Sequence, residues 1–274
     1  MKTSHILIGS CQRKFLADTY TPPSTPKGIV IFSHGFKGFK DWGAFPLMAA
    51  AFAQYNFACI TFNFSHNGTT IEQPDSFADI EAFGNNNISK EVDDLGVVIE
   101  FAMQHFNLIQ TSIPIYLLGH SRGGGISILK AAEDHNIAKV AVWGSVSEFG
   151  NFWKTVEMEK MKREGVIYIP NNRTKQQLPI YWQLYQDYEA NIERLHIPSR
   201  VKCLQIPLLI VHGTQDETVP FSAAQDLKKY QPNAQLVAIE NGNHTFGASH
   251  PWLPTSLPLF TDLALQSTIA FFNS

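Results

Sequence analysis

Residues 119–123 read Gly-His-Ser-Arg-Gly, and they constrain the fold more than any other part of the sequence. Just before them, residues 113–118 form a short apolar run that is typical of a buried strand. Residues 124–132 then resemble a helix that opens on glycines. A strand passing directly into a helix turns so sharply at Ser121 that side chains on the flanking glycines would clash. We therefore expect the Ser121 hydroxyl to be exposed at the carboxyl end of a sheet. A glycine-rich turn with no catalytic role is the alternative interpretation of the same residues.

Short apolar runs alternate with longer helical patterns along most of the chain, which favours βαβ units. The expected strands are residues 28–32, 57–62, 113–118, 140–143, 207–211 and 236–239. The expected helices are residues 41–55, 88–106, 124–132 and 257–272, and residues 5–19 can form an antiparallel hairpin at the sheet edge. The predicted fold class is α/β, with a mostly parallel central sheet and helices on both faces.

Residues 145–202 interrupt this alternation, and we call this segment the cap. The segment is too long for an ordinary connection, and it contains a charged helical stretch at 154–164 and a β-like run at 166–169. We expect one domain over residues 1–274, with the cap as an insertion over the site. Trp182, Tyr185 and Tyr188 follow one another at a spacing of three, which can place them on one helical face. They are candidates for substrate contact, but for any one of them a place in the cap's own small core is the better interpretation.

Composition excludes several classes of function. The net charge is −3 and no basic stripe is present, so nucleic acid is a poor candidate partner. Three cysteines, an odd number without metal-ligand spacing, favour free thiols and a reducing compartment, and Cys59 lies in an expected strand. No feature of the sequence calls for a metal or an organic cofactor.

The apolar stretch before Cys11 is too short for a signal peptide, and no run reaches the ~20 apolar residues of a membrane span. We therefore expect a soluble cytoplasmic protein that does not bind membranes.

Two residues that follow later strands could activate Ser121. A serine hydroxyl needs a neighbouring imidazole to take its proton, and the imidazole needs a carboxylate to orient it. Asp216 lies in the turn after strand 207–211, whereas the adjacent Glu217 should point elsewhere. His244 lies in a loop rich in Gly and Asn after strand 236–239. His250 is the local competitor and is expected in a surface loop.

Acyl transfer also needs hydrogen-bond donors that face the developing oxyanion. One candidate is the backbone N–H of Arg122, which directly follows the serine. The other is the backbone N–H of Phe36, in the turn at residues 33–38 that follows strand 28–32. An ordinary βα turn is the plain alternative for this segment. We call the sharp turn at Ser121 the elbow. His120 is expected to pack beside the elbow, and His212 beside the turn that carries Asp216, both in structural roles.

Four segments together carry a family resemblance: residues 34–36 (His-Gly-Phe), 119–124, 213–220 and 243–244. In this order they resemble the α/β-hydrolase superfamily, and more narrowly its dienelactone-hydrolase-like and bacterial feruloyl (cinnamoyl) esterase branch. The resemblance covers residues from about 28 to the C-terminus. It implies Ser121 as nucleophile and Asp216 and His244 as the residues that relay its proton, and these three form the catalytic triad. It also implies the N–H groups of Phe36 and Arg122 as the oxyanion hole. The turn at 63–68 and a long polar loop up to Asn87 depart from that branch.

The leading hypothesis is a serine carboxylester hydrolase that takes small-molecule esters of apolar or aromatic acyl groups. A serine peptidase or amidase of the same fold would use the same residues and remains open. From a different class, a non-catalytic binding protein of this fold also remains open, although such proteins usually lose a member of the triad. The serine argues against dienelactone hydrolase activity itself, which uses a cysteine. The sequence does not indicate the oligomeric state.

Overall fold

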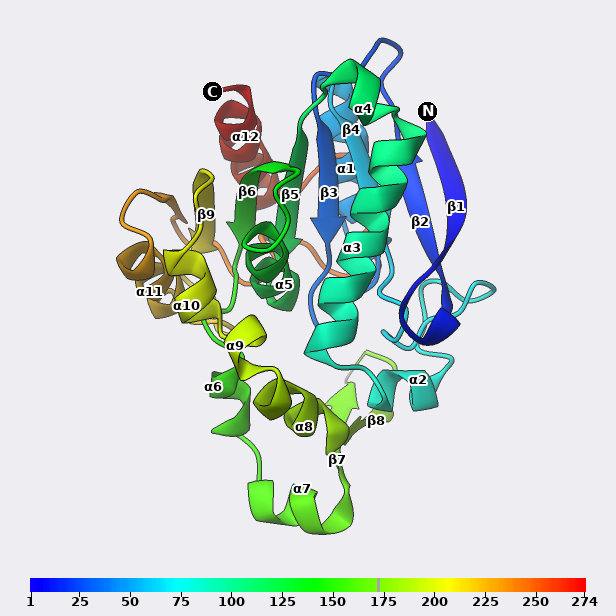
Figure 1. The fold of residues 1–274 in the computed structure, drawn as a ribbon, viewed down its shortest axis with the longest axis vertical. Coiled ribbons are helices and arrows are strands. Elements are labelled where there is room, and N and C mark those ends of the chain that lie inside the picture. The colour runs from blue at the N-terminus through cyan, green and yellow to red at the C-terminus, as the bar shows by residue number, and fades with distance from the viewer. Residues whose placement is uncertain (172) are drawn as a thin grey trace.

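An eight-stranded sheet runs through the middle of the computed structural model, which describes residues 1–171 and 173–274 (Figure 1). Its strands are β1 (Lys2–Ile8), β2 (Lys14–Tyr20), β3 (Ile29–Ser33), β4 (Ala58–Phe62), β5 (Ile115–His120), β6 (Ile137–Trp143), β9 (Leu208–Gly213) and β10 (Gln235–Ile239). They lie in the order β1-β2-β4-β3-β5-β6-β9-β10. The β1–β2 and β2–β4 pairs are antiparallel, and all pairs from β4 to β10 are parallel. The carboxyl ends of the parallel strands therefore lie on the same side of the sheet. The antiparallel hairpin expected over residues 5–19 is confirmed by the pairing of β1 with β2.

Helices cover both faces of this sheet, as the predicted fold class requires. The helical layers contain α1 (Phe45–Gln54), α3 (Ile88–His105), α5 (Arg122–Ala131), α10 (Ile197–Lys202), α11 (Ser222–Tyr230) and α12 (Leu259–Asn273). The short helices α2 (Ile80–Gly84) and α4 (Leu108–Thr111) precede and follow α3, and a 3-10 turn η1 (Ser10–Gln12) lies between β1 and β2. Side chains alternate along β3: Ile29 and Ile31 join the core formed with α3, α5, α10 and α11. Val30 and Phe32 join the core formed with α1 and α12 on the opposite face.

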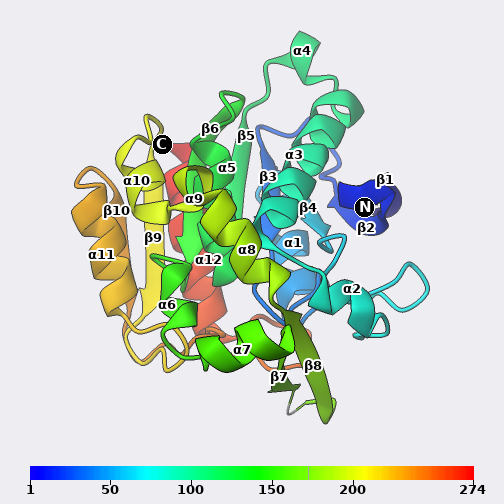
Figure 2. The same ribbon diagram turned by 60° about the horizontal axis from the view of Figure 1, so that its bottom comes forward.

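The cap lies between β6 and β9 and contains its own small sheet. Its elements before α10 are α6 (Gly150–Trp153), α7 (Met158–Glu164), β7 (Val166–Asn171), β8 (Gln176–Tyr181), α8 (Gln183–Ala190) and α9 (Ile192–Leu195). β7 and β8 pair antiparallel, and they lie with α7 beyond the carboxyl ends of the main strands (Figures 1 and 2). The helix expected over 154–164 begins only at Met158. The last element, α10, packs against α5 and α11 and so belongs to the helical layer.

The segment between β4 and α3 is mostly the long loop that the sequence suggested, but it contains the short helix α2. Its first residues are buried, and the Asn63 side chain accepts the N–H of Lys40 at 2.7 Å and donates to Thr69 at 2.9 Å. Asp79 then caps α2 by accepting the N–H of Ala82 at 2.9 Å. Polar composition did not indicate this burial, because these side chains bond to backbone and to one another inside the protein.

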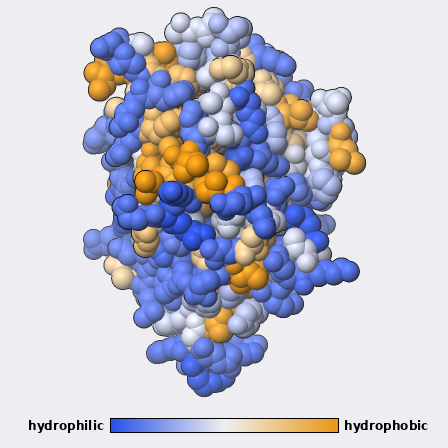
Figure 3. Space-filling model, turned by 90° about the vertical axis from the view of Figure 1, so that its right-hand side faces the viewer, coloured by the Kyte–Doolittle hydropathy of each residue, from blue (hydrophilic) through white to orange (hydrophobic). Residues whose placement is uncertain are grey.

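Among the described residues no helix is both long and apolar enough to cross a membrane. Figure 3 faces the side of the molecule on which β1 forms the sheet edge, and apolar side chains gather on that face. Ile6 and Ile8 of β1 contribute to the exposed apolar surface, with 55% and 51% of their area accessible.

Candidate active site

Ser121 occupies a one-residue turn between β5 and α5. Its φ of 56° and ψ of −121° lie in a region that non-glycine residues rarely adopt. A Cβ on Gly119 would lie 2.2 Å from the carbonyl oxygen of Gly123, and a Cβ on Gly123 would lie 2.3 Å from that of Ser33. The turn therefore closes only with glycine at both positions, as the sequence indicated, and the serine side chain remains partly exposed.

The structure brings Ser121, His244 and Asp216 together from three loops at the carboxyl edge of the sheet. His244 Nε2 lies 3.0 Å from Ser121 Oγ, and His244 Nδ1 lies 2.8 Å from Asp216 Oδ2. Because a carboxylate only accepts, the imidazole donates from Nδ1, which leaves Nε2 free to accept the serine proton. These contacts suit a proton relay from the hydroxyl to the imidazole.

Asp216 is buried but is well supplied with donors. Its Oδ1 accepts the backbone N–H groups of Thr218 and Val219 at 2.9 and 2.8 Å. Its Oδ2 lies 3.3 Å from Nε2 of His212, which also donates to the carbonyl oxygen of Val219 at 2.8 Å. Burial alone would raise the pKa of Asp216, but hydrogen bonds from His212 and His244 outweigh it and hold the pKa well below its usual range. The carboxylate therefore stays ionised beside His244, whereas Glu217 is exposed.

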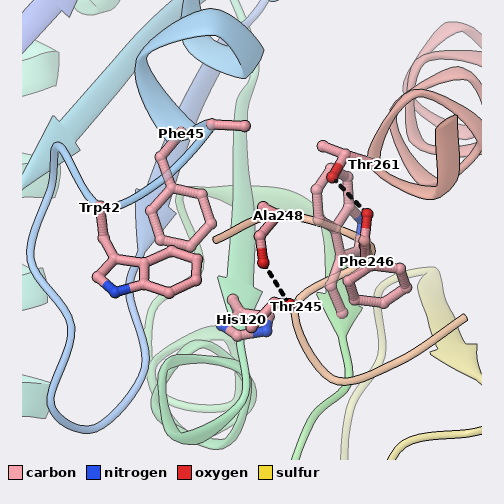
Figure 4. Close-up of a pocket in the computed structure, with 9 residues that line it drawn as sticks. Trp42, Phe45, His120, Thr245, Phe246, Ala248 and Thr261 are labelled. Carbon is pink, nitrogen blue, oxygen red and sulfur yellow. Dashed lines mark hydrogen bonds between the residues drawn. The ribbon is translucent and has the colours of Figure 1, made fainter. Parts of the chain in front are cut away.

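His120 supports the loop that carries His244. Its Nε2 donates to the carbonyl oxygen of His244 at 2.8 Å, and the two rings lie 4.9 Å apart. Burial, together with the nearby His244, lowers the pKa of His120 to about 3, so this ring is neutral. Together with Trp42, Phe45 and Phe246, this ring lines a small, mostly apolar cavity (Figure 4). The structural role expected for His120 agrees with this contact.

The turn after β3 packs directly on the elbow. A Cβ on Gly35 would lie 3.0 Å from Cβ of Ser121, which places the next residue, Phe36, beside the nucleophile candidate. The N–H of Arg122 is the first of α5 and has no acceptor within the helix. The use of these two N–H groups as an oxyanion hole remains a prediction.

Two of the three cap aromatics, Trp182 and Tyr185, stack on each other, and Tyr185 and Tyr188 both lie near Trp153. Trp182 and Tyr185 stack with ring centroids 4.6 Å apart, and Tyr185 lies edge-on to Trp153 at 5.2 Å. Tyr188 is only 4% exposed and lies 6.3 Å from Trp153. Trp182 and Tyr185 keep accessible surface, so substrate contact stays a prediction for these two in particular.

His250 lies in a surface loop, as expected, but it is less exposed than its neighbours Ser249 and Pro251. It is partly buried, its Nδ1 accepts the N–H of Gly43 at 3.0 Å, and its ring meets Phe39 edge-on at 5.0 Å. The difference arises because the loop after β10 returns to pack on the turn before α1. His250 therefore has a structural partner of its own, away from Ser121.

Sequence reasoning also missed a buried ion pair beside the elbow. The Nε of Arg122 donates to Oε2 of Glu91, on α3, at 2.7 Å. The signal available in the sequence was weak, because Glu91 lies 31 residues earlier on a helix that reads as amphipathic. Within residues 1–171 and 173–274, no cluster of three or more His, Cys, Asp or Glu side chains could hold a metal ion.

Three known proteins resemble this chain in sequence or in fold. Monoacylglycerol lipase of Mycolicibacterium smegmatis is 20% identical over 250 residues, which covers 82% of each chain. Monoglyceride lipase of Rattus norvegicus is 29% identical over 117 residues, 42% of this chain but only 33% of the rat protein. Among solved structures, Est1E of Butyrivibrio proteoclasticus with ferulic acid bound superposes with a TM-score of 0.70 at 18% identity, covering 98% of both chains.

The structural match at this low identity shows a shared fold. A family model gives the stronger result, because the one described as the Alpha/beta hydrolase family matches residues 30–254. The matched region runs from β3 through Ser121, Asp216 and His244. The chain therefore belongs to the alpha/beta hydrolase family.

Proposed function

We propose that this protein is a serine hydrolase that cleaves carboxylic esters through an acyl-enzyme intermediate. The observation that carries this proposal is the pair of contacts made by His244, 3.0 Å to Ser121 Oγ and 2.8 Å to Asp216 Oδ2. The lipase names of two relatives support an ester substrate.

In the first half of the reaction, His244 Nε2 takes the hydroxyl proton as Ser121 Oγ attacks the ester carbonyl carbon. The carbonyl oxygen becomes an oxyanion that the N–H groups of Phe36 and Arg122 would stabilise. When the tetrahedral intermediate collapses, the carbon–oxygen bond to the alcohol breaks. The alcohol oxygen takes the proton from His244, and the acyl group stays on Ser121.

In the second half, a water molecule replaces the alcohol. His244 takes a proton from the water as its oxygen attacks the acyl carbon, and a second oxyanion forms in the same place. Collapse breaks the bond to Ser121 Oγ, which recovers its proton from His244 and releases the carboxylic acid. Asp216 remains ionised throughout and stabilises the imidazolium that forms twice in each cycle.

The cap would set the preference for the acyl group. Its first residues border the elbow: the N–H of Val146 lies 3.4 Å from the carbonyl oxygen of Ser121, and a Cβ on Gly124 would meet Ser145. Binding pockets are mostly apolar with a few polar anchors, and Trp182 and Tyr185 present aromatic surface in the cap. We infer a preference for esters of apolar or aromatic acids.

The test is a panel of p-nitrophenyl esters of graded acyl length, together with methyl ferulate and an aminoacyl anilide. We expect ester turnover, and Ser121→Ala should lower kcat by roughly 10⁴–10⁶. A fluorophosphonate should label wild type at Ser121. The matched control is Ser127→Ala, on the next turn of α5, where the hydroxyl bonds to the carbonyl oxygen of Gly123 at 2.8 Å.

Three results would each change the proposal. Labelling at another residue, or full activity in Ser121→Ala, contradicts the assignment of the nucleophile. Faster turnover of the anilide than of the esters would indicate a peptidase or amidase. If Trp182→Ala and Tyr185→Ala raise KM equally for acetate and aromatic esters, the inferred acyl preference is wrong.

A further inference from the structure

The side chain of Arg122 has no part in the mechanism described above, although its backbone N–H does. Its Nε donates to Glu91 at 2.7 Å, and the two side chains are only 13% and 4% exposed. An ion pair buried to this degree costs desolvation energy and contributes little net stability. Its place directly beside the nucleophile therefore calls for an explanation other than stability.

The same guanidinium lies against the ring of Phe36. The central carbon of the Arg122 guanidinium is 5.3 Å from the centroid of that ring, within the range of a cation–π contact. The Phe36 ring also contacts Phe83 of α2, with centroids 5.6 Å apart. The side chain of one expected oxyanion donor residue thus packs on the side chain of the other.

Glu91 fixes the position of this guanidinium. Its Oε2 accepts from Arg122, and its Oε1 accepts from Asn86 Nδ2 at 2.6 Å, so both carboxylate oxygens are used. Nη2 of Arg122 is buried without a hydrogen-bond partner among the described residues. The Nε–Glu91 bond and the contact with Phe36 are therefore the interactions that orient the group.

We propose that Arg122 and Glu91 are positioning residues that hold the backbone N–H groups of Arg122 and Phe36 in a fixed mutual arrangement for the oxyanion. This inference rests on the proposed hydrolase function. Two donors on separate loops must point at one oxygen, and an error of a fraction of an ångström weakens both hydrogen bonds. A planar guanidinium can stack on a ring and donate in its plane at the same time, whereas a lysine ammonium cannot.

The experiment compares Arg122→Gln, Glu91→Gln and the double variant with wild type, using a p-nitrophenyl ester that wild type hydrolyses. Arg122→Gln keeps the backbone N–H and loses the guanidinium. We expect kcat to fall about 10- to 100-fold, less than the ~10²–10³ caused by complete removal of one donor, with KM changed by less than about threefold. The double variant leaves no unpaired buried charge, so it keeps the test valid if a single variant fails to fold.

A second readout addresses the oxyanion directly. An alkylboronic acid forms a tetrahedral adduct with the serine, and its inhibition constant should rise by about the same factor as kcat falls. The matched control is Lys130→Gln, which removes another largely buried cation at the far end of α5, where Nζ bonds to Glu133 at 2.6 Å. Its kcat and boronate affinity should equal those of wild type.

The outcomes separate this inference from the function on which it rests. Wild type that neither hydrolyses esters nor takes up a fluorophosphonate contradicts the proposed function. Active wild type with unchanged kcat in Arg122→Gln and in the double variant contradicts only the positioning role. A fall in kcat without a loss of boronate affinity, or an equal fall in Lys130→Gln, also contradicts it.

Discussion

His120 should make the folded protein sensitive to mild acid, and the size of the effect follows from its environment. Burial lowers the pKa of this histidine from its ordinary 6.5 to about 3. Between these values the unfolded chain binds a proton that the folded protein does not, so stability is lost as the pH falls below about 6.5. From about pH 7.5 to about pH 5 the loss is about 2 kcal/mol, and about 0.8 kcal/mol of it has already occurred at pH 6.

The variant His120→Gln isolates this contribution from those of other groups. Glutamine can still donate to the carbonyl oxygen of His244, but it does not titrate. The free energy of unfolding is measured by urea denaturation of both proteins at several pH values. We expect the advantage of wild type over the variant to shrink by about 2 kcal/mol between about pH 7.5 and pH 5. A difference that stays constant within about 0.5 kcal/mol, or that grows in acid, would refute the reasoning.

Two further predictions concern the elbow and the relay. His244→Ala should abolish most ester turnover, and the double variant with Ser121→Ala should be no less active than either single variant, because the residues act as a unit. His250→Ala should keep the kcat of wild type on the same ester, and the reverse pattern would overturn the assignment. Gly123→Ala should fail to accumulate as folded protein or should unfold at a much lower temperature by circular dichroism, because its Cβ would lie 2.3 Å from the carbonyl oxygen of Ser33; a normal melting temperature would show that the turn can relax.

Most of the sheet could be predicted from the sequence because its strands are short apolar runs bounded by turns. Strand β3 is one example: all five of its residues are buried, so the run is continuous and easily recognised. The proximity of Ser121, Asp216 and His244 was predictable for a related reason, since each of them lies within five residues of the end of an evident strand. Parallel topology then brings those ends together without any further information.

The parts that escaped prediction depend on contacts between distant polar residues. Asn63 and Thr69 look like loop residues in the sequence, yet their side chains are buried in mutual hydrogen bonds. The pairing of Glu91 with Arg122 joins a helix face to a turn, and neither position has a pattern that specifies the other. The contacts of His250 escaped prediction because its partners, Phe39 and Gly43, lie about 200 residues earlier in the chain.

The attachment of α8 has a consequence for how ligands exchange with the site. Gln183 bonds to Asn87 and to the carbonyl oxygens of Gly84 and Asn86, and Asp187 accepts the N–H of Ser89. These are four hydrogen bonds to the segment from the end of α2 to the start of α3. At about 1 kcal/mol each, breaking all four costs about 4 kcal/mol. Only about one molecule in 10³ then has α8 detached at any moment. For the proposed ester hydrolysis, we therefore expect substrates to reach Ser121 mainly while α8 remains attached.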